Sequence, residues 1–126
     1  MAIAKVGGTG SSAGAINYVL SENKEETKQP EILAGSFGTM AEIKQEFEAY
    51  NKQNPRIKNQ ATHISVSFSQ SERVKTEKKI ELAEKLLEKL DFKNVPYLVV
   101  EHFDKDYEHF HIIAGRIRDN GTTVKE

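Results

Sequence analysis

The pattern of apolar and polar residues predicts strands alternating with helices along the chain. The strongest strand signal lies at residues 61–69, where Ile64, Val66 and Phe68 alternate with polar residues. Successive side chains of a strand point to opposite faces of its sheet, so this pattern favours a half-polar strand. The strongest helix signal lies at residues 72–90, where apolar residues recur at every third or fourth position and share one helical face. The many Glu and Lys residues between them indicate a solvated opposite face.

Weaker signals indicate the other elements. A helix is expected over residues 13–22 with Ser11 or Ser12 as its cap, and another over residues 40–53 with Thr39 as its cap, since hydroxyl side chains accept from free N–H groups at helix starts. Further strands are expected at residues 2–6, 30–37, 95–103 and 109–118. The order β-α-β-α-β-α-β-β predicts one α+β domain, with a largely antiparallel sheet and helices packed on one face.

Composition restricts the classes of protein that remain. A length of 126 residues suits a single domain. The 18 basic and 19 acidic residues give a net charge of −1, so any surface that binds nucleic acid must be local rather than general. The absence of cysteine excludes disulfides and thiolate metal sites and is typical of a reducing cytoplasm. No apolar run approaches the roughly 20 residues of a membrane helix, so we expect no contact with a membrane.

Three of the four histidines lie in one short segment, EHFDKDYEHFHIIAGR, residues 101–116. His109 and His111 are two apart and therefore share one face of a strand. The intervening DKDYE suits a hairpin, which would bring His102 across from the pair. An isolated surface histidine usually binds nothing, but three converging imidazoles predict a divalent metal ion with positions left for water or substrate. The acids between them are expected to shape the turn or orient an imidazole.

One tyrosine lies off the apolar stripe of its helix. In the helix over residues 13–22, Tyr18 points away from the side that carries Ile16 and Val19. Such a tyrosine is either an ordinary exposed residue or a nucleophile, because a phenol can attack phosphorus and hold the product covalently. Tyr107, beside the histidines, is the second candidate. His63 is either an exposed spectator or part of the same polar surface.

Three segments together resemble a known family. INYVL (residues 16–20), HISVSF (residues 63–68) and HFDKDYEHFHIIAGRI (residues 102–117) resemble the tyrosine, central-strand and histidine motifs of plasmid mobilization relaxases, which are HUH endonucleases. The resemblance extends over nearly the whole chain. It implies a ferredoxin-like relaxase fold and identifies residues 1–126 as the catalytic domain, expected to be the N-terminal core of a longer protein.

The resemblance also implies a reaction. Tyr18 would attack the scissile phosphate of single-stranded DNA at an origin of transfer, in a site- and strand-specific nick. It would leave a free 3′-hydroxyl and a covalent 5′-phosphotyrosine, and the reverse step would rejoin the strand. His102, His109 and His111 would hold one divalent ion, Mg or Mn. Accessory mobilization proteins are expected partners.

Few residues are available for contact with DNA. The candidates are Lys5, His63, Arg116 and Arg118. The two arginines lie on the same face of the strand as Phe110, so a twist of the strand would have to bring them to DNA.

Two other functions remain open. A ferredoxin-like module could bind single-stranded nucleic acid without cutting it, and a metallohydrolase could use a metal-bound water instead of Tyr18.

Overall fold

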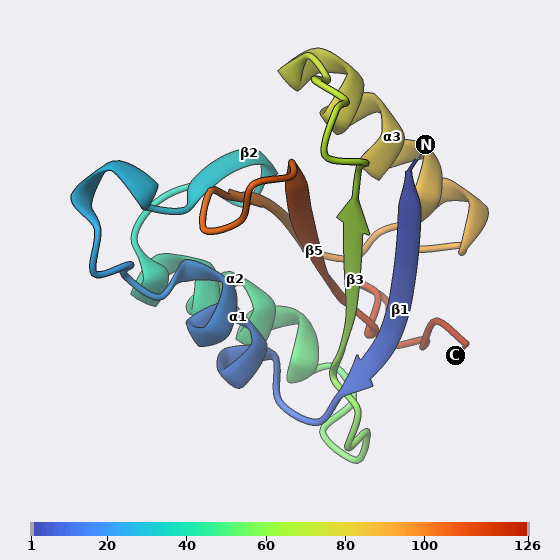
Figure 1. The fold of residues 1–126 in the computed structure, drawn as a ribbon. Helices are drawn as coiled ribbons and strands as arrows, with labels where there is room; N and C mark the ends of the chain where they lie inside the picture. Colours follow the sequence, from blue (N-terminus) through green and yellow to red (C-terminus); the bar gives the residue numbers. More distant parts are fainter. Residues whose placement is uncertain (1, 126) are drawn as a thin grey trace.

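The computed structural model describes residues 2–125, which form one five-stranded antiparallel sheet with three α-helices (Figure 1). The elements are β1 (Ile3–Thr9), α1 (Ser12–Leu20), the 3₁₀ helix η1 (Glu26–Lys28), β2 (Glu31–Gly35), α2 (Met40–Asn51), β3 (Ala61–Ser67), α3 (Thr76–Lys89), β4 (Tyr97–His102) and β5 (His109–Gly115). The predicted α+β class and the predicted order of strands and α-helices are confirmed; only the short η1 is additional.

The strand order β1-β3-β5-β4-β2 places β3 and β5 at the centre of the sheet. Every neighbouring pair is antiparallel. In the β4–β5 hairpin His102 lies directly opposite His109, and across the β3–β5 pair Ser65 lies opposite His111. The predicted hairpin is therefore confirmed, and its register brings the three clustered histidines onto one face.

The helices cover both faces of the sheet, so the prediction of helices on one face was wrong. α3 packs on the face that carries Ile64 and Phe110, whereas α1 and α2 pack on the face that carries Leu98 and Ile113 (Figure 1). The physical reason lies in β4 and β5, whose apolar residues are nearly continuous and are buried on both sides. Among residues 2–125, no helix is long and apolar enough to cross a membrane.

α1 and α2 leave part of their face of the sheet uncovered. Lys5 and Gly7 of β1 are exposed there, opposite Ser65 and His63 of β3, which are half-buried. A shallow hollow of about 270 Å³ lies over these residues. The sheet thus presents a polar, open surface next to the histidines.

The predicted helix caps hold. Ser11 accepts a hydrogen bond from the Gly14 amide at the start of α1, and Thr39 forms a reciprocal capping box with Glu42 at the start of α2. Each cap satisfies backbone amides that have no partner inside the helix. For α1 this fixes where a helix of only nine residues begins, and hence where Tyr18 lies along it.

A buried lysine ties α3 to the histidine hairpin. Lys79 is only 3% exposed, although its helix face was predicted to be solvated. Its Nζ lies 2.6 Å from Glu101 Oε2 and 3.2 Å from Glu108 Oε1. Glu108 also accepts a hydrogen bond of 2.7 Å from the amide of Val74. Because the two glutamates directly precede His102 and His109, this network braces both sides of the hairpin.

We predict that Lys79→Met destabilises the domain by about 3–5 kcal/mol, because it leaves the Glu101 carboxylate buried without its partner. The free energy of unfolding, measured in urea, checks this. Lys78→Met is the matched control: Lys78 is the preceding residue, and its exposed side chain contacts only Glu81 among the pairs observed, so little change is expected. Equal stability of the two variants would contradict the role given to Lys79.

Candidate active site

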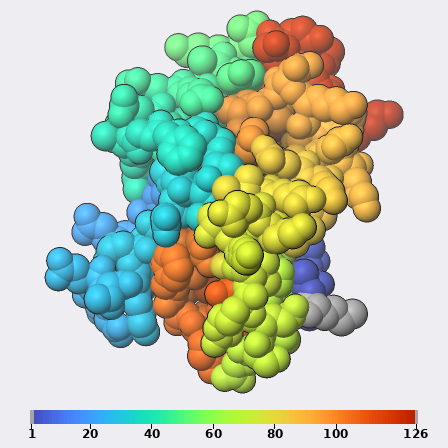
Figure 2. All heavy atoms as spheres, turned by 90° about the horizontal axis from the view of Figure 1, so that it is seen from above, coloured from blue at the N-terminus to red at the C-terminus, as the bar shows by residue number. Residues whose placement is uncertain are grey.

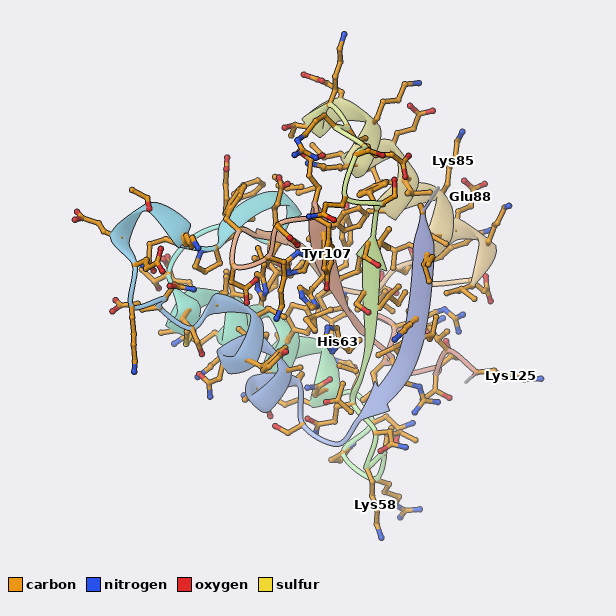
Figure 3. The ribbon with its side chains drawn as sticks, viewed as in Figure 1. Lys58, His63, Lys85, Glu88, Tyr107 and Lys125 are labelled. Carbon is orange, nitrogen blue, oxygen red and sulfur yellow. The ribbon has the colours of Figure 1, made fainter. Side chains whose placement is uncertain are left out.

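Three histidines converge on one face of the sheet, as predicted. His102 comes from the end of β4, and His109 and His111 come from β5. One ring nitrogen from each lies within 4.8 Å of the others, and the ring centroids are 4.3–5.7 Å apart. His63 and Tyr107, both labelled in Figure 3, flank the cluster in ring contact with His111 and His109, respectively.

In His102 and His111 one ring nitrogen forms a hydrogen bond that orients the ring, and the second ring nitrogen is left for an ion. His102 Nε2 donates to the carbonyl oxygen of Val19 at 2.8 Å, which leaves Nδ1 as its lone-pair nitrogen. A hydrogen bond of 2.7 Å joins His111 Nδ1 to His63 Nε2. Partners of this kind hold a ligating imidazole in one tautomer and one orientation.

The third imidazole has an acidic neighbour. His109 Nε2 lies 3.2 Å from the Asp104 carboxylate, and its Nδ1 is 3.5 Å from the Tyr107 carbonyl oxygen. Asp104 is the acid of the hairpin that contacts an imidazole; that it orients the ring stays a prediction. Three imidazole nitrogens within 4.8 Å of one another could hold one divalent ion. Zinc, for example, binds imidazole nitrogen at about 2.0–2.1 Å.

Burial favours the neutral form of the two cluster histidines of β5, His109 and His111. It lowers the pKa of His111 to about 3, with a further contribution from the charges of the neighbouring histidines when they are protonated. Burial also lowers the pKa values of His63 and His109; the charge of His102 adds to this effect at both, while at His109 the Tyr107 carbonyl and Asp104 oppose it. Neutral imidazoles keep the lone pairs that a metal ion requires.

Tyr18 borders the histidine cluster. Its side chain is 62% exposed, and its ring lies edge-on to those of His63 and His111, with centroids 5.8 and 6.1 Å away. Ile16 and Val19 enter the core from the same helix, so the phenol is placed by buried neighbours. The Val19 carbonyl, one of the last in the helix and without a partner inside it, is the group that His102 binds. The C-terminal end of α1 is therefore docked on the cluster.

Tyr107 also lies beside the cluster. It belongs to the connection between β4 and β5, is partly exposed, and stacks at a tilt on His109 with centroids 5.5 Å apart. Its position differs from that of Tyr18 in one respect. Tyr18 is carried by a helix that is packed on the core, whereas Tyr107 belongs to an exposed turn.

The four residues predicted to contact DNA have different surroundings. Lys5 and His63 lie on the open part of the sheet next to the cluster. The Arg116 guanidinium donates to the carbonyl oxygens of Asn59 and Val124. The Arg118 guanidinium donates to Asp91 and to the chain at residues 122–123. Both arginines thus hold the C-terminal segment in place, and Lys5 and His63 are the predicted contacts that border the cluster.

Two features of the site were not anticipated from the sequence. The Val19 carbonyl that orients His102 is a backbone group, and no residue type signals it. A hollow beside Tyr18, lined in part by Phe103, depends on how the loop after α1 folds back. The only available signal for the latter was an apolar residue in a polar turn.

We predict that the metal-free protein loses stability as the pH falls below about 6.5. The unfolded chain binds protons on its histidines near that pH, whereas folded His111 resists protonation down to a pKa of about 3. The unfolded state is therefore favoured on acidification, by about 1.4 kcal/mol per pH unit for this group. Urea unfolding in EDTA between pH 7.5 and 5 measures the slope. His111→Asn should flatten it; an unchanged slope would contradict the assignment.

Comparison with known proteins identifies the family of this chain. The family model "Relaxase: MobA/VirD2-like, nuclease domain" matches residues 18–126, a range that begins at Tyr18 and contains all four histidines. No curated protein gives a significant match. The family match covers most of the chain and confirms the resemblance noted in its motifs. This protein belongs to the MobA/VirD2-like relaxase nuclease domain family.

Proposed function

We propose that this relaxase domain nicks single-stranded DNA at an origin of transfer, in a site- and strand-specific reaction with Tyr18 as the nucleophile. The observation that carries the proposal is the ring contact of the exposed Tyr18 phenol with His111 of the cluster and with His63 beside it. A nucleophile of this kind must be exposed to reach DNA and yet be fixed relative to the groups that bind the phosphate. Tyr18 meets both conditions because its helix is anchored through Ile16 and Val19.

The step proposed is a transesterification. The Tyr18 oxygen forms a bond to phosphorus, and the bond from phosphorus to the 3′ oxygen breaks. The phenol gives up its proton and the departing 3′ oxygen gains one, which yields a free 3′-hydroxyl and a 5′-phosphotyrosine. One phosphodiester is exchanged for another, so the reverse step can rejoin the strand without an external energy source.

His102, His109 and His111 would hold a divalent ion, which when bound supplies positive charge to the scissile phosphate. Of the two ions expected for the family, the donor set favours Mn over Mg, since imidazole suits transition metals better than it suits Mg²⁺. The chain's own part is to keep ligand nitrogens unprotonated and the rings oriented. Burial lowers the pKa values of His109 and His111, and hydrogen bonds with the Val19 carbonyl and with His63 orient His102 and His111.

The DNA strand is proposed to cross the open part of the sheet. Lys5 lies there on the same face as His63, two residues along β1 from Gly7. A single lysine can bind one phosphate locally, but it cannot provide the broad positive surface that holds a DNA backbone by charge alone. Most of the affinity must therefore come from contacts with the sugars and bases.

We predict that Tyr18→Phe abolishes a covalent protein–DNA adduct. The native protein, Mn²⁺ and a randomised pool of single-stranded oligonucleotides should give a product of raised mass on a denaturing gel, and sequencing the captured DNA identifies the site. Tyr107→Phe is the matched control and should still form the adduct. If Tyr18→Phe forms it and Tyr107→Phe does not, Tyr107 is the nucleophile. If no variant forms it but DNA binds, the domain is a binding module.

We predict that His111→Ala loses measurable binding of Mn²⁺ in a calorimetric titration, since it removes one of the three ligands. His63→Ala should weaken binding by about 10–100-fold, the usual effect of removing a partner that orients a ligand. Ser67→Ala, on the same strand and face as His63, should leave the affinity unchanged. Full binding by His111→Ala would show that the ion, if any, is held elsewhere.

A further inference from the structure

Beside Tyr18, a hollow of about 210 Å³ opens between the end of α1 and the β4–β5 connection. Figure 2 shows these two segments side by side, the loop after α1 in light blue and the connection in orange. Residues of both the proposed nucleophile and the metal-binding cluster form its inner wall. Its lining includes Tyr18, Asn23, Lys28, His102, Phe103 and Asp104.

The outer wall of the hollow is held by the loop's own hydrogen bonds. The Gln29 side chain accepts from the Asn23 amide at 3.0 Å and donates to the carbonyl oxygens of Asn23 and Glu25 at 2.6 and 3.1 Å. The inner wall is fixed by the bond between His102 and the Val19 carbonyl. Both walls are therefore held by the protein's own hydrogen bonds, and little ordering opposes binding there.

Exposed aromatic rings gather around the same place. Of the four aromatic side chains that are exposed among residues 2–125, Tyr18, Phe103 and Tyr107 lie at the hollow or at the histidine cluster, and only Phe37 lies outside them. Phe103 is 38% exposed in a turn that is otherwise polar. Exposed rings stack on the unpaired bases of single strands.

The charges at the hollow favour a neutral occupant. Its lining contains the carboxylates of Glu22 and Asp104, which would repel a phosphate, and one cation, Lys28, whose Nζ lies 3.3 Å from Glu25. An apolar ring among polar groups of both signs suits a nucleobase, which has a flat apolar face and a polar edge.

We propose that this hollow receives one unpaired base next to the scissile phosphate and that Phe103 stacks on it. The inference rests on the proposed function for the position of the phosphate at Tyr18. The hollow is a subsite for the nucleotide that neighbours the cut, and the class of ligand is an unpaired base of single-stranded DNA.

Phe103→Trp gives a direct test, because the chain contains no tryptophan of its own. In the presence of Mn²⁺, octathymidylate should quench the indole fluorescence of this variant by stacking. An eight-unit sugar–phosphate chain without bases should not. Phe37→Trp is the matched control and should be quenched by neither. Equal quenching by the two chains, or equal quenching in the two variants, would overturn the proposal.

Affinity provides an independent readout. Phe103→Ala should weaken binding of octathymidylate about 10-fold, as expected for the loss of one stacked base, and should leave binding of the base-free chain and of Mn²⁺ unchanged. Phe37→Ala should change none of these. An unchanged affinity of Phe103→Ala for octathymidylate would overturn the proposal. Neither measurement needs a covalent product, so failure of the adduct assay would count against Tyr18 and not against the subsite.

Discussion

The antiparallel pairing of β4 with β5 is the constraint on which the site depends. It sets His102 opposite His109, and the two-residue period of the strand adds His111 on the same face. A shift of one residue in this register would move His109 and His111 to the side of α3. The register is held by the apolar residues of β5, which are buried on both faces, and by Lys79, which binds the glutamates at both sides of the turn.

The second essential contact joins the helix of the nucleophile candidate to this hairpin. A helix as short as α1 has little stability of its own, so its place is set by Ile16 and Val19 in the core and by the Val19 carbonyl at His102. The His102 imidazole thus donates a proton to the helix end and, in the proposed site, would offer its other nitrogen to the ion. A rotation of the His102 ring would disturb both the histidine cluster and the end of α1. The distance between the Tyr18 phenol and the cluster is therefore set by packed secondary structure and not by flexible loops.

The local parts of this arrangement could be predicted from the sequence, and the non-local parts could not. Alternation in residues 61–69 and the spacing of His109 and His111 specify strands and faces, and the length of the turn specifies the hairpin. The covering of both sheet faces depends on how helices distant in sequence pack. The same is true of Lys79, which is buried although the preceding Lys78 is exposed. It is also true of Arg118, which binds Asp91 across 27 residues. Charge alone does not tell a lysine that enters the core from one that meets water.

The distribution of charge explains how a chain with a net charge of −1 can offer a site to DNA. Glu101 and His102 are consecutive in β4, so their side chains leave the sheet on opposite faces. The carboxylate is neutralised by Lys79 under α3, and the imidazole joins the cluster under α1. The Glu101 carboxylate, which the fold needs for stability, is in this way kept on the opposite side of the sheet from the histidine cluster. A site built so has little surplus positive charge, which agrees with the proposal that it binds a nucleotide through its base as well as through its phosphate.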